Sequence, residues 1–178
     1  MWIGLWLAGC VVGGGESSWT FQGATSMTAS LANGDLRVWS SGGPETLVTY
    51  DGGGVGRAAL PDVWQDSDGS VHADGGGQLG GGDLDVWVSD GIPVAGFLDR
   101  GDLSVELTAP ADIEACVGAG SVSIGVPAGA YALEIDAGVG SVDLEIVDDP
   151  SAAHTIHVCV GAGDIDVHVY DPMLTASE

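Results

Sequence analysis

The sequence predicts an all-β fold, in which repeats of about 20 residues stack short strands into a β-solenoid or a two-sheet β-prism. Three observations lead to this fold class. A glycine followed by Asp or Ser begins a recurrent segment, and aliphatic residues occupy alternate positions within that segment. The chain also contains 31 glycines among 178 residues and no long helical pattern, which is typical of many short strands joined by tight turns.

The first nine residues are predicted to be a lipoprotein signal peptide. The apolar run from Trp2 to Ala8 is too short to span a bilayer as a helix. It leads into the tetrapeptide LAGC, which resembles the bacterial lipobox and so implies cleavage before Cys10 and lipid attachment to that cysteine. Residues 10–18 are then expected to form a flexible tether, because they are rich in Gly and Ser. No Lys or Arg precedes the apolar run, so two alternatives stay open: the true start of the chain lies upstream of this methionine, or the segment is a hydrophobic first strand.

The β-repeat domain is expected to cover residues 19–171, with the clearest repeats over 101–171 and a C-terminal tail over 172–178. The recurrent segment occurs as GDLRVWS at Gly34, GDLDVWV at Gly82, GDLSVEL at Gly101, GSVSIGV at Gly120, GSVDLEI at Gly140 and GDIDVHV at Gly163. The first interval is 48 residues, and the later ones are 19, 19, 20 and 23. The long first interval leaves room for a missing copy and an insertion. Glycine suits the turn because it reaches positive φ at little cost, and the Asp or Ser after it can bond to nearby backbone.

Alternation at period two places the aliphatic residues of each strand on one buried face. The expected core residues of the last three copies are Val122, Ile124 and Val126; Val142, Leu144 and Ile146; and Ile165, Val167 and Val169. Partner strands are predicted at Ile113–Val117, Tyr131–Ala137 and Thr155–Val160. One repeat cannot bury its own aliphatic face, so we expect the repeats to stack in chain order.

Stacking in chain order has a consequence for the last predicted strand, Asp164–Tyr170. This strand is expected to be an open sheet edge, where backbone groups are free to pair with another chain. Asp164 and Asp166 place charge along it, and Pro172 stops it, since proline lacks the N–H that a ladder needs.

The pentapeptide CVGAG, at Cys116–Gly120 and again at Cys159–Gly163, is interpreted as a strand end followed by a turn. The repeat between the two copies has DAGVG at Asp136–Gly140 in the same place. This succession of strand, GxG turn and strand about every 20 residues resembles the bacterial adhesin-like "toastrack" domains. The resemblance covers Leu103 to Tyr170 well and Trp19 to Gly101 loosely. It implies a β-repeat fold at the cell envelope and brings no catalytic residues with it.

The charge of the chain is strongly acidic. There are 26 Asp and Glu residues against three arginines, Arg37, Arg57 and Arg100, and the formal net charge is −23. Such a chain repels nucleic acid phosphates, so no nucleic acid partner is expected. The absence of lysine excludes Schiff-base chemistry and a P-loop.

The three cysteines are Cys10, Cys116 and Cys159. If Cys10 carries lipid, the other two remain as a pair in an oxidising compartment, which favours a disulfide. Stacking in chain order opposes it, because strands two repeats apart lie about 9.5 Å apart, whereas a disulfide needs Cα atoms within about 7 Å. Only a different strand order would bring the two cysteines together.

The tryptophans are the candidate ligand contacts. All six lie in the first 87 residues, and Trp39 and Trp87 fall on the strand face opposite the aliphatic residues. An exposed aromatic pair suits stacking on a sugar ring or contact with a partner protein. The alternative is that a loop or the N-terminal segment covers the pair, since the ends of a repeat stack need capping.

No metal site or cofactor is predicted. His157 and Cys159 share a strand face near His154, but no CxxC motif occurs, and His168 belongs to the other strand of its repeat. Residues 53–58 resemble the calcium-binding β-roll nonapeptide, but alanine stands where that motif has aspartate. Weak calcium binding by carboxylates such as Asp164 and Asp166 stays open.

We expect a non-catalytic lipoprotein of the bacterial cell envelope, extracytoplasmic, and at the outer membrane in preference to the inner one. No nucleophile, base and acid stand at a recognisable spacing, so no enzyme activity is predicted. The expected role is structural or adhesive, and the alternative is a glycan- or calcium-binding module. The expected partners are the membrane, through the lipid, and a cell-surface glycan or protein.

Overall fold

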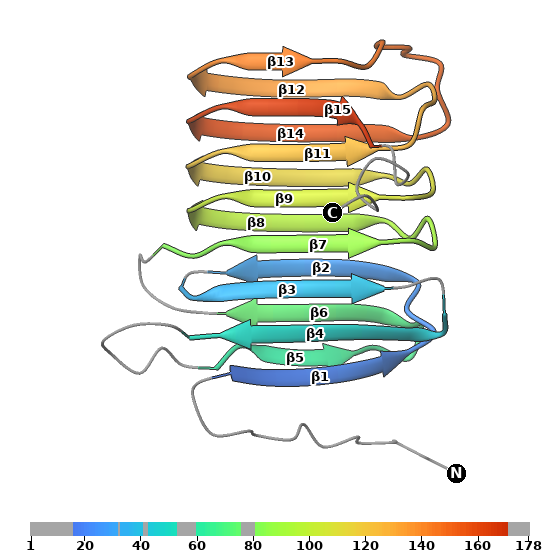
Figure 1. The fold of residues 1–178 in the computed structure, drawn as a ribbon, viewed down its shortest axis with the longest axis vertical. Helices are drawn as coiled ribbons and strands as arrows, with labels where there is room; N and C mark the ends of the chain where they lie inside the picture. Colours follow the sequence, from blue (N-terminus) through green and yellow to red (C-terminus); the bar gives the residue numbers. More distant parts are fainter. Residues whose placement is uncertain (1–15, 32, 41–42, 53–59, 76–80, 171–178) are drawn as a thin grey trace, which may run out of the picture.

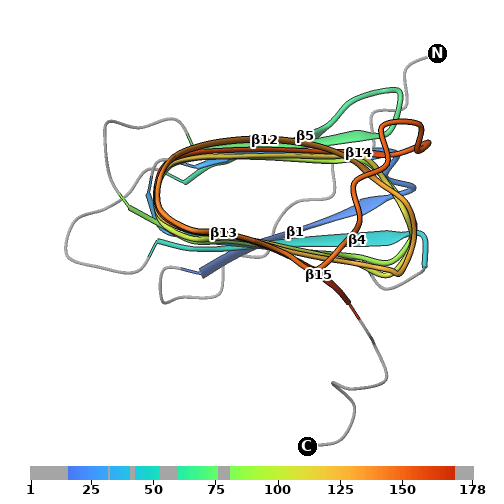
Figure 2. The ribbon, with the colours of Figure 1, turned by 90° about the horizontal axis from the view of Figure 1, so that it is seen from above.

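The computed structural model describes residues 16–31, 33–40, 43–52, 60–75 and 81–170. Within these residues it contains fifteen strands and no helix. The strands form two sheets that face each other, and Figure 2 shows the chain passing from one sheet to the other around a flattened ring. The prediction of an all-β fold of stacked short strands is confirmed.

Most neighbouring strands in the two sheets are parallel. The eight-stranded sheet runs in the order β1 (Glu16–Gln22), β4 (Glu45–Asp51), β3 (Asp35–Ser40), β7 (Leu84–Val88), β9 (Leu103–Leu107), β11 (Val122–Val126), β15 (Ile165–Val169), β13 (Val142–Leu144). The seven-stranded sheet runs in the order β12 (Ala132–Val139), β14 (Thr155–Ala162), β10 (Ile113–Ala119), β8 (Val94–Arg100), β2 (Ser26–Leu31), β6 (Ser70–Gly75), β5 (Asp62–Gln65). Antiparallel pairing joins β4 to β1 and β3, and β5 to β6, all at one end of the stack (Figure 1).

The core lies between the two sheets and follows the predicted alternation. In β11, for example, Val122 and Ile124 are buried while Ser123 between them is partly exposed. Ile165 and Val167 of β15 are buried in the same way, and Val158 and Val160 of β14 face them from the other sheet. The pleat of each strand thus sends one set of side chains inward, and the facing sheet supplies the surface that buries them.

The order of the repeats differs from the prediction. We call each pair of strands joined by a glycine turn a coil: β8–β9, β10–β11, β12–β13 and β14–β15. The β14–β15 coil lies between β10–β11 and β12–β13, although it is the last in the chain (Figure 1). Stacking in chain order is therefore wrong for the last two coils.

Three further expectations are corrected, the first two because of this order. The strand predicted as an open edge, β15, is an inner strand between β11 and β13. Leu144, predicted to be a core residue, is 40% exposed, because β13 has a neighbour on one side only. At the other end of the chain, β1 begins at Glu16, so Glu16–Ser18 form part of a strand where the sequence predicted tether.

The turn glycines stack into a ladder from coil to coil. A Cβ atom on Gly120 would overlap the carbonyl oxygen of Gly101, one on Gly163 would overlap that of Gly120, and one on Gly140 would overlap that of Gly163. Gly120, Gly140 and Gly163 also have φ between 145° and 150°, a conformation that other residues rarely adopt. The first glycines of the GxG turns stack in the same manner, in the order Gly118, Gly161, Gly138. The GxG motif thus permits the backbones of successive coils to approach closely.

The Asp or Ser after each glycine links one coil to the next. The Asp102 carboxylate accepts a hydrogen bond of 2.9 Å from the N–H of Ser121 in the following coil. The Asp164 carboxylate accepts bonds of 2.9 Å from the N–H and 2.7 Å from the hydroxyl of Ser141. The hydroxyl bond and then the backbone bond lower the pKa of Asp164. These residues were expected to bond to local backbone, whereas the structure uses them to join coils.

Candidate functional site

Trp39 and Trp87 form a stacked pair on the outer face of the eight-stranded sheet. They lie directly opposite each other in β3 and β7, with ring centroids 4.2 Å apart and ring planes inclined by 17°. The alternate residues of both strands, such as Val38 and Val86, are buried, so the pair projects away from the core as predicted. Trp39 is 52% exposed, and among the described residues no loop covers it.

Tyr170 extends the pair from a distant part of the chain. The Trp87 indole N–H donates to the Tyr170 hydroxyl over 3.5 Å, although β9 and β11 separate β7 from β15. Gly125 of β11 makes this possible, because a Cβ there would lie 3.2 Å from the Cβ of Tyr170 and 3.1 Å from Nε2 of His168. The sequence analysis missed Tyr170, since nothing in its local pattern indicates that it crosses two strands.

We use the term aromatic ledge for Leu47, Trp39, Trp87 and Tyr170. Leu47 lies opposite Trp39 in β4 and is 39% exposed, so it continues the apolar surface beyond the tryptophans. The ledge therefore runs across the sheet, perpendicular to the strands, with rings at its centre.

Polar side chains border the aromatic ledge. Glu106 of β9 lies directly opposite Trp87, and the exposed ion pair of Arg37 with Asp85 spans 3.5 Å one row away. On the far side of Gly125, Nδ1 of His168 lies 2.8 Å from the Asp166 carboxylate. The surface thus combines flat rings with carboxylate oxygens, which are groups that stack on a pyranose and accept bonds from its hydroxyls. The carboxylates disfavour an anionic ligand at the same place.

Cys116 and Cys159 lie directly opposite each other in β10 and β14 and form a disulfide, with Cα atoms 4.5 Å apart. The sequence analysis placed them two coils apart. The insertion of β14 next to β10 removes that separation. Both cysteines are partly exposed on the outer face of the seven-stranded sheet, the face that the alternation predicted for them.

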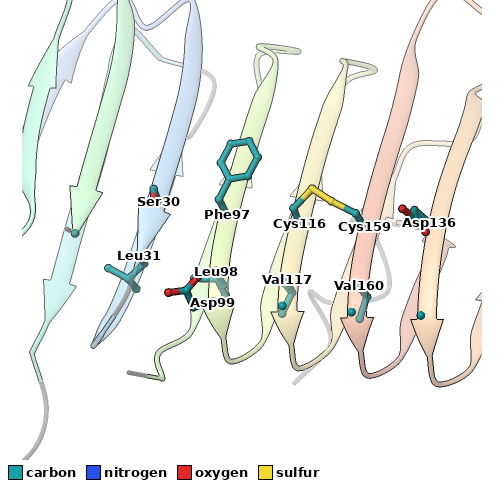
Figure 3. A pocket seen from close by; sticks show the side chains of 14 residues that line it. Ser30, Leu31, Phe97, Leu98, Asp99, Cys116, Val117, Asp136, Cys159 and Val160 are labelled. Carbon is teal, nitrogen blue, oxygen red and sulfur yellow. A yellow bond between two sulfur atoms is a disulfide. The ribbon is translucent and has the colours of Figure 1, made fainter. Parts of the chain in front are cut away.

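A groove of about 570 Å³ runs along this face beside the disulfide (Figure 3). Its floor is low because Gly118, Gly138 and Gly161 have no side chains, and Phe97 and Asp136 stand at its sides. The groove is a consequence of the glycine stacking. It is a weaker candidate than the aromatic ledge, because it presents a single aromatic side chain.

The histidines and carboxylates of the described residues do not form a metal centre: no three His, Cys, Asp or Glu side chains among them are grouped to hold an ion. Cys159, the thiol considered for zinc, is in the disulfide, and His157 lies 3.8 Å from Glu114. For the calcium alternative, the Asp164 carboxylate is bound to Ser141. Residues 53–58 and Cys10 lie outside the described residues.

Comparison with known proteins gives no relatives for this chain: no family model, curated protein or solved structure matches it. In the part of the chain that the structure describes, no helix has the length and hydrophobicity needed to cross a membrane.

Proposed function

We propose that this protein is a lipid-anchored, non-catalytic adhesive domain of the bacterial cell envelope, and that it binds neutral glycans on the aromatic ledge. The stacked Trp39–Trp87 pair carries the proposal, because Trp39 is 52% exposed and Trp87 is half-buried beside it. Large apolar side chains at the surface of a stable β-sheet mark a binding surface more often than isolated exposed residues do.

The chemistry of the ledge supports a neutral sugar. One face of each indole is covered by the other ring, so the C–H groups of a pyranose would stack on the remaining face of Trp39, which is 52% exposed. The Glu106 carboxylate beside Trp87 is an acceptor for sugar hydroxyls. The net charge of −23 opposes binding of uronic or sialic acids. A stack of rigid strands holds the rings in place, so little side-chain entropy is lost on binding.

Replacing Trp39 with alanine is expected to weaken binding of a neutral oligosaccharide by about tenfold or more, because it removes half of the stacked pair. Tryptophan fluorescence, recorded against a panel of neutral and acidic oligosaccharides, measures the affinity. Trp64→Ala is the matched control: Trp64 is 42% exposed, but it lies in β5 of the other sheet, against His72. Equal loss in both variants, or no response to any sugar, would contradict the proposed ligand.

Replacing Cys10 with serine is expected to move the protein from the membrane fraction to the soluble fraction, because serine cannot receive the lipid. Fractionation followed by immunoblotting measures the shift. The double variant Cys116→Ser/Cys159→Ser is the control, since it removes the other two cysteines and keeps Cys10. If Cys10→Ser stays with the membrane, the lipid anchor is refuted and glycan binding is left as a separate question.

A further inference from the structure

The β12–β13 coil is the last coil at one end of the stack, and none of the described strands lies beyond it (Figure 1). Val142 and Leu144 are 43% and 40% exposed, whereas their partners in the next coil, Ile165 and Val167, are buried. On β12, Leu133 and Ile135 are partly buried, while Ile156 and Val158 beside them are buried. We call this surface, formed by Leu133, Ile135, Val142 and Leu144, the end face.

The opposite end of the stack is built differently. There, β1 pairs antiparallel with β4, and Trp19 and Phe21 pack against the core with bulky rings. A change of strand direction together with large side chains is a common way to finish a repeat stack, because it interrupts the template for a further coil. The end face has neither feature, since its strands stay parallel and its side chains are of ordinary core size.

The outer backbone edge of the end coil is covered at one corner by residues that the structure describes. Asp148 forms a parallel bridge with Tyr131 beside the start of β12. Its carboxylate accepts a 3.0 Å hydrogen bond from the N–H of Leu133, and the N–H of Asp149 donates to the carbonyl oxygen of Tyr131. Beyond this corner no described strand pairs with the free sides of β12 and β13. Both strands therefore offer open hydrogen-bonding edges beside apolar side chains, the arrangement that accepts an added strand.

The charged side chains on β12 and β13 determine which kind of strand can pair with the two open edges. Glu134 and Asp136 project from β12, Asp143 and Glu145 project from the β13 side, and all four are exposed. A second copy of this chain would place the same four carboxylates opposite them, and like charges directly opposite each other destabilise a strand pair. Strands with Lys or Arg at the outward positions would instead form cross-strand ion pairs along both edges.

We infer that the end face is a docking surface for a protein partner that adds one further coil to both sheets. Its strands would carry aliphatic side chains toward the core and basic side chains outward. This inference is independent of glycan binding, because the aromatic ledge lies on a different surface of the molecule.

The test uses a charge-reversed copy of the full chain as the probe for such a partner. Glu134→Lys, Asp136→Lys, Asp143→Lys and Glu145→Lys together give the same end face with basic edges. All four carboxylates are exposed, so circular dichroism should report an unchanged fold. In sedimentation velocity, an equal mixture of wild type and this variant is expected to shift from monomer to a one-to-one dimer. The shift should weaken by about tenfold or more when salt screens the ion pairs.

Two controls make the result specific. The variant Glu16→Lys/Asp51→Lys/Asp62→Lys/Asp74→Lys carries the same charge change at the opposite end and should stay monomeric with wild type. Leu144→Asp in both components should abolish the dimer. No dimer in the mixture, or equal association of the control variant, would overturn the inference. If the wild type dimerises alone and Leu144→Asp abolishes that dimer, the end face binds a second copy of this chain and the inferred basic partner is wrong. A dimer that forms only after removal of residues 171–178 would make the tail the occupant.

Discussion

Replacing Gly163 with valine is expected to lower the free energy of unfolding by more than about 4 kcal/mol, a large part of the roughly 5–15 kcal/mol that stabilises a typical protein. The added Cβ would overlap the carbonyl oxygen of Gly120 in the neighbouring coil, and it would sit on a backbone with φ of 147°. Neither conflict can be relieved by a side-chain rotation, because the obstructing atom is backbone. The coils must therefore separate, and every buried contact between them weakens. Urea denaturation followed by circular dichroism measures the loss.

Substitutions at two other glycines distinguish how much backbone strain and how much close approach between coils contribute to the loss of stability. Gly23 has φ of 63° but nothing within 4 Å of an added Cβ, so Gly23→Ala should cost about 1–2 kcal/mol from backbone strain alone. Gly129 has neither a positive φ nor a tight contact, and Gly129→Ala should be close to neutral. If Gly163→Val destabilises no more than Gly23→Ala, the close stacking of the glycine ladder is not what holds the coils together.

The double variant Cys116→Ala/Cys159→Ala is expected to lose about 4 kcal/mol of stability, the chain-entropy value for a loop of this length. The two cysteines are 43 residues apart, so the disulfide restricts a long segment of the unfolded chain. Both side chains are only partly buried, so the alanines leave little cavity and the loss reports mainly the cross-link. Urea denaturation of the wild type, with and without reductant, should reproduce the difference.

The double variant supplies its own control, because reductant should no longer change its denaturation midpoint. A wild type whose midpoint is the same in oxidising and reducing buffer would show that the cross-link contributes nothing. The disulfide also bears on coil order, because it can form only with β14 beside β10. A variant without it therefore tests whether packing alone keeps β12–β13 at the end of the stack.

Much of this architecture could be predicted from local pattern. The alternation of aliphatic residues assigns each strand residue to the inner or outer face, because successive side chains on a strand point in opposite directions. That rule placed Val122 and Ile124 inside, and Trp39, Trp87 and both partner-strand cysteines outside, as the structure has them. The glycine turns were predictable for a similar reason, since few other residues adopt the φ of Gly120.

The order of the coils was not predictable, and the corrections to the edge strand, to Leu144 and to the cysteine pair follow from it. Each coil has the same alternation and the same turn, so the pattern alone does not rank one neighbour over another. The longer link between β13 and β14 permits the last coil to return to β10, where β14 pairs with β10 and the disulfide joins the two strands. Leu144 is exposed for this reason, although its local sequence is that of a core residue.

The fold class, the positions of the turns and the face on which each strand residue lies could be derived from the sequence, because these depend on backbone geometry over a few residues. The three-dimensional arrangement was needed to learn which coils touch, that Cys116 pairs with Cys159, that Tyr170 reaches Trp87 across Gly125, and that β12–β13 lies at the end of the stack. These outcomes depend on packing between segments far apart in the chain. Several coils have nearly the same sequence pattern, so local pattern does not distinguish the possible coil orders. The order with the most favourable total packing energy is the native one.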